Sequence, residues 1–298
     1  MSILNGENNM YNFDKSQEKQ IIIDYEGNYS LKKIAEKYQV DREAIKRILK
    51  KNNVHFRKRT KKYTNNSFYF DKIDREDKAY FLGFIYADGC VHKSTKYNSY
   101  SLRIAIVEKD KEIISDFKKN IQSNHKIYHH DRRSFGWQDQ VSICINDNHL
   151  CNSLINSGCT ERKSTTCSFP SCVPNHLLSH FIRGYFDGDG SICATSHYIY
   201  PVVRMCATHS FASKIKEIIY KKLKINTNII YKKSAIYDSE YSKKRAMIFL
   251  DWMYNNSTFY LKRKYNRYLF FKKYYQNSKG GLNRKIREIE WNKIKNNY

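Results

Sequence analysis

Two aspartates each end a largely apolar segment and precede a glycine: Asp88 before Gly89, and Asp189 before Gly190. An apolar segment without polar alternation is typical of a buried helix rather than a hairpin. A carboxylate at the C-terminus of a helix lies at the negative end of the helix dipole, and two such carboxylates side by side repel each other. A divalent cation removes both conflicts, and hard oxygen ligands favour Mg2+. The chemistry that such a pair supports is metal-assisted hydrolysis.

The two apolar segments must form helices that pack closely for this chemistry to work. Small residues recur in them at a spacing of four: Gly83 and Ala87, and Gly184 and Gly188. Residues four apart share one face of a helix, so these faces allow two backbones to approach. Pairing the helices through them brings Asp88 and Asp189 together. Gly89 and Gly190 are predicted to adopt the left-handed conformation that closes a helix.

The two segments belong to an internal repeat with an offset of 101 residues. At the same offset Arg103 aligns with Arg204, within alternating apolar residues that predict strands. Lys163 likewise aligns with Lys264, and we interpret this pair as phosphate contacts or structural residues. Helical and strand patterns recur in the same order, so the sequence predicts two copies of one α/β unit related by a pseudo-twofold axis.

The charge of the chain points to a polyanionic partner. In 298 residues, 54 Lys and Arg stand against 29 Asp and Glu, which gives a formal net charge of +25 and favours nucleic acid. The longest apolar run covers residues 79–87, far short of the ~20 residues of a membrane-spanning helix. No secretory signal is visible, and the eight cysteines contain no CxxC motif. We therefore expect reduced cysteines and a cytoplasmic protein without a membrane partner.

Residues 16–56 predict a small helical unit. Ser16, Ser30 and Asp41 are predicted to cap three short helices, of which the second and third resemble a helix-turn-helix. The outward face of the third helix is basic, which suits a helix that lies on DNA. The residues expected to contact DNA there are Arg42, Lys46, Arg47 and Lys50.

The segments FLGFIYADG (81–89) and IRGYFDGDG (182–190) resemble the paired motifs of the LAGLIDADG homing endonucleases, in their two-motif, single-chain form. The resemblance covers roughly residues 75–275. It implies an α+β fold of two αββαββα units packed through the motif helices, with the helix-turn-helix as an appended module. We expect domains at residues 1–60, 61–170 and 171–275, followed by a basic tail at 276–298.

The resemblance also implies an activity. A monomer would hydrolyse both strands of a long, imperfectly palindromic DNA site, reading it with strand side chains in the major groove and cutting across the narrowed minor groove. The residues that match the metal site are Asp88 and Asp189, together with Gly89 and Gly190, and the metal would be Mg2+. Such an enzyme would serve intron homing or a similar mobile element, and the composition suggests a bacterial or phage-infected cell.

The sequence departs from the family pattern in two places. Tyr86 stands where the second copy has Asp187, a position that is generally not a metal ligand. Basic residues near the cleavage centre are expected after the last strand of each copy. In the second copy they are Lys243 and Lys244, whereas residues 143–148 of the first copy contain no Lys or Arg.

Other basic residues are candidates for reading the groove. Arg103 and Arg204 form the best pair, because they occupy equivalent strand positions. The remaining candidates are Arg132, Arg133, Lys232, Lys233 and Arg245.

Two other functions stay open. A transcription regulator could use an inactive LAGLIDADG fold for binding alone, although a pure binder has no need for two repelling carboxylates. An RNA splicing maturase would share the fold and the charge, and would prefer structured intron RNA to duplex DNA.

Overall fold

The computed structural model describes residues 13–57, 62–95, 98–160, 163–195, 199–233, 236–276 and 284–296. The chain divides into two compact units, residues 1–62 and residues 63–298. The first unit contains α1 (Lys15–Glu26), α2 (Leu31–Lys37) and α3 (Arg42–Lys51), which pack around a small apolar core.

Side chains cap all three of these helices. Ser30 and Asp41 cap α2 and α3 as predicted, each accepting a backbone N–H three residues on. The predicted cap Ser16 is wrong, because α1 begins earlier. Asp14 caps it instead and forms a reciprocal capping box with Gln17.

The second unit contains the repeat, and both copies fold in the predicted order of helix, two strands, helix, two strands and helix. The first copy consists of α4 (Glu76–Asp88), β1 (Gly89–Ser94), β2 (Ser99–Val107), α5 (Lys111–Asn120), β3 (Ile127–His130), β4 (Gln140–Ile145) and α6 (Asn148–Asn156). The second consists of α8 (Leu178–Asp189), β5 (Gly190–Ala194), β6 (Pro201–Ala207), α9 (His209–Leu223), β7 (Ile229–Lys233), β8 (Ile236–Ser242) and α10 (Lys243–Tyr254). The predicted α+β class and the two αββαββα units are confirmed.

Short helical elements complete the unit. Two 3-10 turns, η1 (Glu108–Asp110) and η2 (Arg133–Phe135), interrupt the first copy, and α7 (Lys163–Thr166) follows it. The second copy is followed by α11 (Lys262–Gln276) and α12 (Arg284–Asn296). Trp291 of α12 is buried against the rings of Phe270 and Phe271, so α12 packs on α11.

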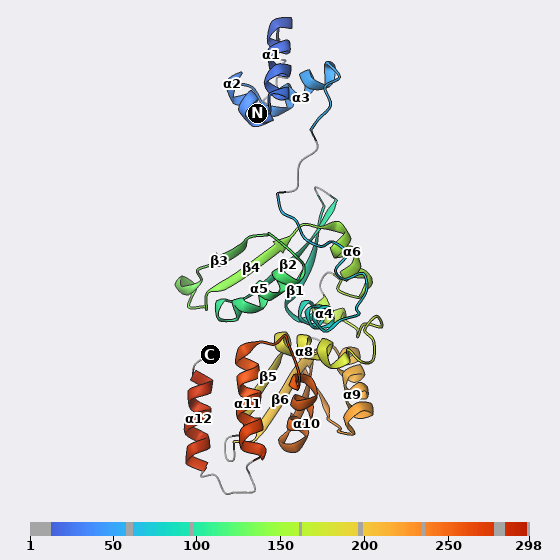
Figure 1. The fold of residues 1–298 in the computed structure, drawn as a ribbon, viewed down its shortest axis with the longest axis vertical. Coiled ribbons are helices and arrows are strands. Elements are labelled where there is room, and N and C mark those ends of the chain that lie inside the picture. The colour runs from blue at the N-terminus through green and yellow to red at the C-terminus, as the bar shows by residue number, and fades with distance from the viewer. Residues whose placement is uncertain are drawn as a thin grey trace, which may run out of the picture. The chain divides into compact units, whose positions relative to one another are not determined.

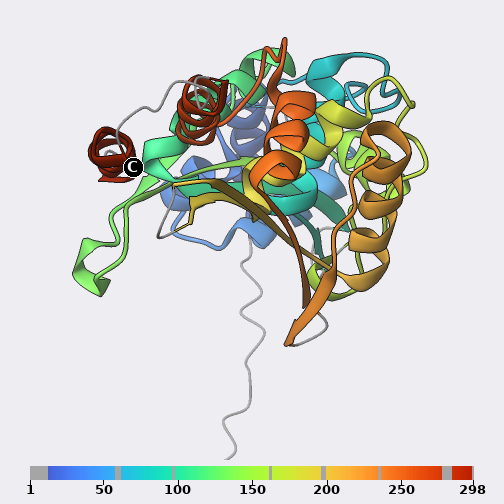
Figure 2. The same ribbon diagram turned by 90° about the horizontal axis from the view of Figure 1, so that it is seen from below.

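Each copy forms one antiparallel sheet, with the strand orders β1-β2-β4-β3 and β5-β6-β8-β7. Alternate strand residues are buried, so one face of each sheet packs on helices and the other is open. In Figure 2 the orange helices of the second copy, α9 and α10, lie on one side of its strands. The two copies meet through α4 and α8, which lie between the sheets (Figure 1). Residues 79–86 of α4 are buried all round, which accounts for the uninterrupted apolar segment.

Candidate active site

The helices α4 and α8, called the motif helices from here on, touch through their backbones. A Cβ atom added to Gly83 would lie 2.0 Å from the carbonyl oxygen of Phe181. One added to Gly184 would lie 1.9 Å from the carbonyl oxygen of Tyr80. Any larger residue at either glycine would force the helices apart, so these two positions set how closely the helix ends approach.

The C-termini of the motif helices are equally close. A Cβ atom on Gly188 would lie 2.2 Å from the Cβ of Ala87 and 3.1 Å from Oδ2 of Asp88. The Asp88 carboxylate therefore lies against the backbone of the opposite helix, one residue before Asp189. The fold thus places the two aspartates at the same junction.

The predicted left-handed conformation of Gly89 and Gly190 is wrong. Their φ angles are −81° and −97°, in the extended region, because the chain passes directly from each motif helix into a strand. Glycine is needed for space instead. An added Cβ would lie 2.6 Å from Cγ2 of Ile85 at Gly89, and 2.1 Å from Cδ2 of Phe186 at Gly190.

Both carboxylates have raised pKa values. Loss of surrounding water, and then the charge of Asp189, raises the pKa of Asp88 to about 6. The pKa of Asp189 is also raised, because protein atoms displace water around it even though its side chain keeps contact with solvent. Lys264 and Lys163 oppose the rise at both carboxylates. The repulsion inferred from the sequence is therefore present at Asp88, where loss of water is the larger cause of the shift, and the two lysines oppose it.

Two buried lysines cap the motif helices. Their Nζ atoms donate to backbone carbonyls at 2.5–3.2 Å: Lys163 to Ala87 and Gly89, and Lys264 to Phe186 and Asp187. A cation at this place offsets the negative end of a helix dipole. Burial lowers the pKa of Lys264 to about 8, against the pull of Asp187. Lys163 is the first residue of α7, the helix that follows the first copy, and Lys264 lies in the first turn of α11, the helix that follows the second copy.

For each aspartate of the junction, the lysine that opposes the rise in pKa most strongly comes from the other copy. Lys264 is the first cation to lower the pKa of Asp88, and Lys163 is the first to lower that of Asp189. A cavity of about 210 Å3 supports the second pairing, because Lys163 and Asp189 both line it, with Tyr185 beside them. The alignment of these lysines at the offset of 101 is the sequence signal for their role, although the sequence alone did not place them in the site.

The structure does not bring Lys243 and Lys244 to the carboxylates. They begin α10 directly after Ser242, which pairs with Val202 of β6. The residue of β6 beside the carboxylates is Met205, which pairs with Gly190 and lies three residues further along the strand. The Lys243 ammonium lies over the ring of Tyr200, 5.8 Å from its centroid. Arg245 donates to the carbonyl of Asn226 at 3.2 Å. The catalytic role given to Lys243 and Lys244 therefore has no geometric support, because the chain places them at the far end of the sheet.

The equivalent arginines on the open faces of the two sheets have different cross-strand partners. Arg103 is exposed and lies opposite Cys144. Its counterpart Arg204 is exposed too, but it lies opposite Glu240 and forms an ion pair with it at 2.7 Å. Lys232 is paired with Asp238 at 3.2 Å. The side chain of Lys233 lies outside the described residues.

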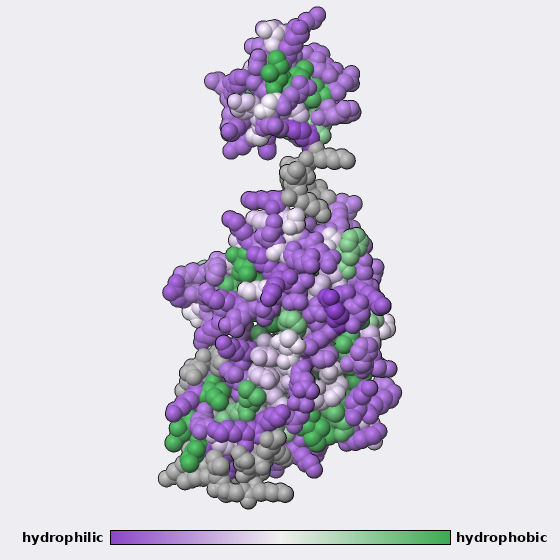
Figure 3. Space-filling model, in the orientation of Figure 1, coloured by the Kyte–Doolittle hydropathy of each residue, from purple (hydrophilic) through white to green (hydrophobic). Residues whose placement is uncertain are grey.

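The loop between β3 and β4 presents aromatic and basic side chains together. Arg132 lies over the ring of Trp137, which is 61% exposed, and Phe135 is 74% exposed. Arg133 is paired with Asp131 at 2.8 Å. In the first unit Arg42, Arg47 and Lys50 are exposed on α3, whereas Lys46 is paired with Glu43 at 2.6 Å. The visible surface is predominantly hydrophilic (Figure 3).

The donor set at the helix junction fits a hydrated hard cation. Among the described residues no group of three or more His, Cys, Asp or Glu could hold a metal ion. Two carboxylates would therefore supply the side-chain ligands, and water and substrate phosphate the rest. Mg2+ usually binds in this way, through one or two carboxylates, retained waters and phosphate oxygens. The carbonyl of Gly89, predicted beside the metal, accepts the Lys163 ammonium at 2.5 Å.

Residues 63–298 have the LAGLIDADG fold, with two αββαββα copies packed through their motif helices. The structure is similar to that of the I-LtrWI LAGLIDADG homing endonuclease bound to target DNA, with a TM-score of 0.50 at 16% identity, over 78% of this chain and 98% of that one. It is similar to a mutant of I-SmaMI with the same TM-score at 14% identity, over 74% of this chain and 98% of the other.

The sequence comparison supports the same family resemblance. Residues 177–255 match the family model of the LAGLIDADG-like domain, which covers the second copy of the repeat. No curated protein matches the sequence. Among the described helices, none is both long enough and apolar enough to cross a membrane.

Proposed function

We propose that the protein is a site-specific endonuclease that hydrolyses both strands of duplex DNA with Mg2+. The observation that carries the proposal is the junction of the motif helices, where Asp88 and Asp189 meet with raised pKa values beside two buried lysines. The net charge of +25 supports a nucleic-acid substrate. The similar I-LtrWI structure is that of a homing endonuclease bound to its target DNA.

In this proposal Asp88 and Asp189 hold the divalent cation. When bound, the cation supplies activation of water and stabilisation of the leaving oxygen. Lys163 and Lys264 each lie next to the carboxylates of the junction and add positive charge where a phosphate must approach. Preorganised charge of this kind stabilises a transition state without reorganisation at the moment of reaction.

In this proposal, side chains on the open faces of the two sheets read the DNA sequence. Arg103 and Arg204 occupy equivalent positions there, consistent with a long and imperfectly palindromic site bound by one chain. The acidic partners Glu240 and Asp238 make the second face different from the first. The basic face of α3 in the first unit would add contacts to DNA outside this region, through Arg42, Lys46, Arg47 and Lys50. We also propose that the protein acts in the cytoplasm of a bacterial or phage-infected cell.

Cleavage of a DNA library tests the proposal. The library would cover the locus around the gene, including the allele that lacks the gene, and digestion would run with Mg2+ and with chelator. We expect discrete double-strand breaks at one site with Mg2+ only. Specific binding without any cut would favour the regulator, and binding of structured intron RNA in preference to every duplex would favour the maturase.

A further inference from the structure

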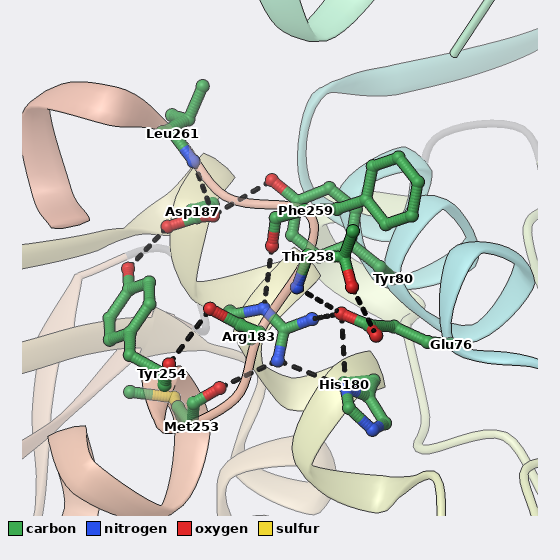
Figure 4. Close-up of polar contacts among 11 residues, drawn as sticks. Glu76, Tyr80, His180, Arg183, Asp187, Met253, Tyr254, Thr258, Phe259 and Leu261 are labelled. Carbon is green, nitrogen blue, oxygen red and sulfur yellow. Dashed lines mark hydrogen bonds and ion pairs between the residues drawn. The ribbon is translucent and has the colours of Figure 1, made fainter. Parts of the chain in front are cut away.

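A group of polar side chains around Arg183 and Asp187 contacts the chain that leads through Thr258 and Leu261 towards Lys264 (Figure 4). Asp187 is completely buried, and its carboxylate accepts three hydrogen bonds. The donors are the hydroxyls of Tyr80 and Tyr254 and the backbone N–H of Leu261, at 2.8, 2.5 and 2.8 Å. The carbonyl of Leu261 in turn accepts the N–H of Lys264 at 2.9 Å. Asp187 therefore fixes the point at which the chain enters the helix that carries Lys264.

Arg183 and Glu76 hold the chain just before that point. The guanidinium of Arg183, completely buried, donates to the carbonyls of Met253 and Phe259 at 2.6 and 2.8 Å. It also forms an ion pair with Glu76 at 2.7 Å. Glu76 accepts the N–H and the hydroxyl of Thr258 at 2.8 and 2.9 Å. Residues 255–261, called the second connection from here on, are thus held by side chains from both motif helices.

The first copy holds its corresponding chain by different chemistry. Tyr86 occupies the position equivalent to Asp187, and its hydroxyl donates to the backbone carbonyl of Ser157. Leu82 stands where the second copy has Arg183. In the first copy a neutral hydroxyl therefore holds the chain that follows the last helix, whereas in the second copy a buried charged network holds it.

Burial of these charged side chains costs free energy of folding, so we expect it to serve a function. A charged group without water is unfavourable unless hydrogen bonds satisfy it, and removing one partner of such a network leaves the others unsatisfied. Asp187 is completely buried and its carboxylate oxygens are occupied by two hydroxyls and the N–H of Leu261, so it does not act as a ligand of the cation. Of its three bonds, the one from the N–H of Leu261 holds the second connection, and the other two come from tyrosines of α4 and α10.

We propose that Asp187 is a positioning residue for Lys264, and that cleavage of one DNA strand depends on it while cleavage of the other depends on Tyr86. The proposal rests on the endonuclease function. The two lysines are related by the pseudo-twofold axis of the repeat, as are the two strands of a duplex. Displacement of one lysine should therefore slow cleavage of one DNA strand.

Strand-resolved cleavage of a supercoiled plasmid tests the proposal, with the wild type compared with Asp187→Asn and the matched variant Tyr86→Phe. Asparagine keeps the size of the side chain but cannot accept from all three donors. We expect Asp187→Asn to accumulate nicked circles, with one end-labelled strand cut at least tenfold more slowly and half-saturation of the DNA unchanged. Tyr86→Phe should slow the opposite strand. Equal slowing of both strands by either variant, or slowing of the same strand by both, would overturn the proposal.

A second readout does not need cleavage. Lys264 is 1% exposed and should resist an amine-acetylating reagent in the wild type, as followed by mass spectrometry. Asp187→Asn should speed acetylation of Lys264 several-fold and leave the acetylation rate of Lys163 unchanged, and Tyr86→Phe should do the reverse. If no DNA is cut by the wild type but this crossed pattern appears, the endonuclease function fails while the positioning holds. A protected Lys264 in Asp187→Asn overturns the positioning itself.

A milder variant covers the case in which Asp187→Asn does not fold. Tyr254→Phe removes one of the three bonds to Asp187 and keeps the aromatic ring. It should give the same strand preference and the same acetylation of Lys264, to a smaller extent. A cooperatively folded Tyr254→Phe protein that cuts both strands at wild-type rates, with Lys264 protected, would contradict the proposal.

Discussion

Lys163 and Asp189 line the same cavity although they belong to different copies of the repeat. Lys163 is the first cation to lower the pKa of Asp189, and Lys264 has the same relation to Asp88. Each half of the site is therefore built from both copies. A junction of this kind exists only when the motif helices are in contact, which ties the site to the glycines that let them touch.

Replacing Asp88 by asparagine should stabilise the protein at neutral pH. Folding raises the pKa of Asp88 from 3.8 to about 6, so the ionised side chain opposes folding above that pH, and this cost disappears as the pH falls below 3.8. One pKa unit corresponds to about 1.4 kcal/mol, and partial exposure reduces the effect, so we expect a gain of about 1–2 kcal/mol. Denaturant unfolding in chelator at pH 7.5 and pH 4 measures it.

The gain in Asp88→Asn should be smaller at pH 4 than at pH 7.5, because the wild-type side chain is then largely protonated. A variant that is less stable than the wild type at pH 7.5 would show that Asp88 is not under electrostatic conflict.

Cleavage should fall as the pH drops through about 6. Asp88 must be ionised to hold a cation, and its pKa in the folded protein is about 6. Single-turnover rates at limiting Mg2+ from pH 5 to pH 8 test this, and a higher Mg2+ concentration should shift the midpoint to lower pH. A rate that stays constant down to pH 5 at limiting Mg2+ would contradict the assignment of Asp88 as a ligand.

Deleting residues 1–60 should weaken DNA binding and flatten its dependence on salt. The exposed basic face of α3 carries Arg42, Arg47 and Lys50. The slope of log K against log salt falls by about 0.9 for each contact to a duplex phosphate that is lost. The slope is measured for the full chain and for the deletion on the same site, and an unchanged slope would mean that α3 does not touch the backbone of the DNA.

Glu240→Gln should tighten DNA binding. Glu240 holds Arg204 in an ion pair at 2.7 Å, and the neutral amide would free that guanidinium for the DNA. Exposed ion pairs contribute about 1 kcal/mol or less, so the gain should be a few-fold, with a steeper salt dependence. Glu217→Gln on α9, which breaks the exposed pairs with Lys214 and Lys221, is the matched control and should change little. Weaker binding by Glu240→Gln would mean that Glu240 itself contacts a base.

The fold was largely predictable from the sequence because the repeat supplied the same information twice. Small residues four apart, followed in each copy by an Asp-Gly pair, define a close helix contact, and the structure has this contact at Gly83 and Gly184. The conformation of Gly89 was not predictable, because a helix that closes and a helix that runs into a strand can have the same sequence.

The lysines were harder to place than the aspartates. Lys163 lies 75 residues after Asp88, and only the fold shows that its ammonium returns to the end of α4. A local signal pointed to Lys243 instead, since it follows a strand in a basic cluster. Local patterns report helices and strands, whereas the polar partners of a buried charge are set by contacts distant in sequence.

The most direct test of the central claim is cleavage by Asp189→Asn compared with the wild type, on the site identified from the library. The account predicts that the wild type cuts this site with Mg2+ and not with chelator. Asp189→Asn should bind the same site with similar affinity in a shift assay and leave it uncut. Cleavage by Asp189→Asn at a rate near that of the wild type would contradict the account, because the junction of the motif helices would then not be the place where the DNA is cut.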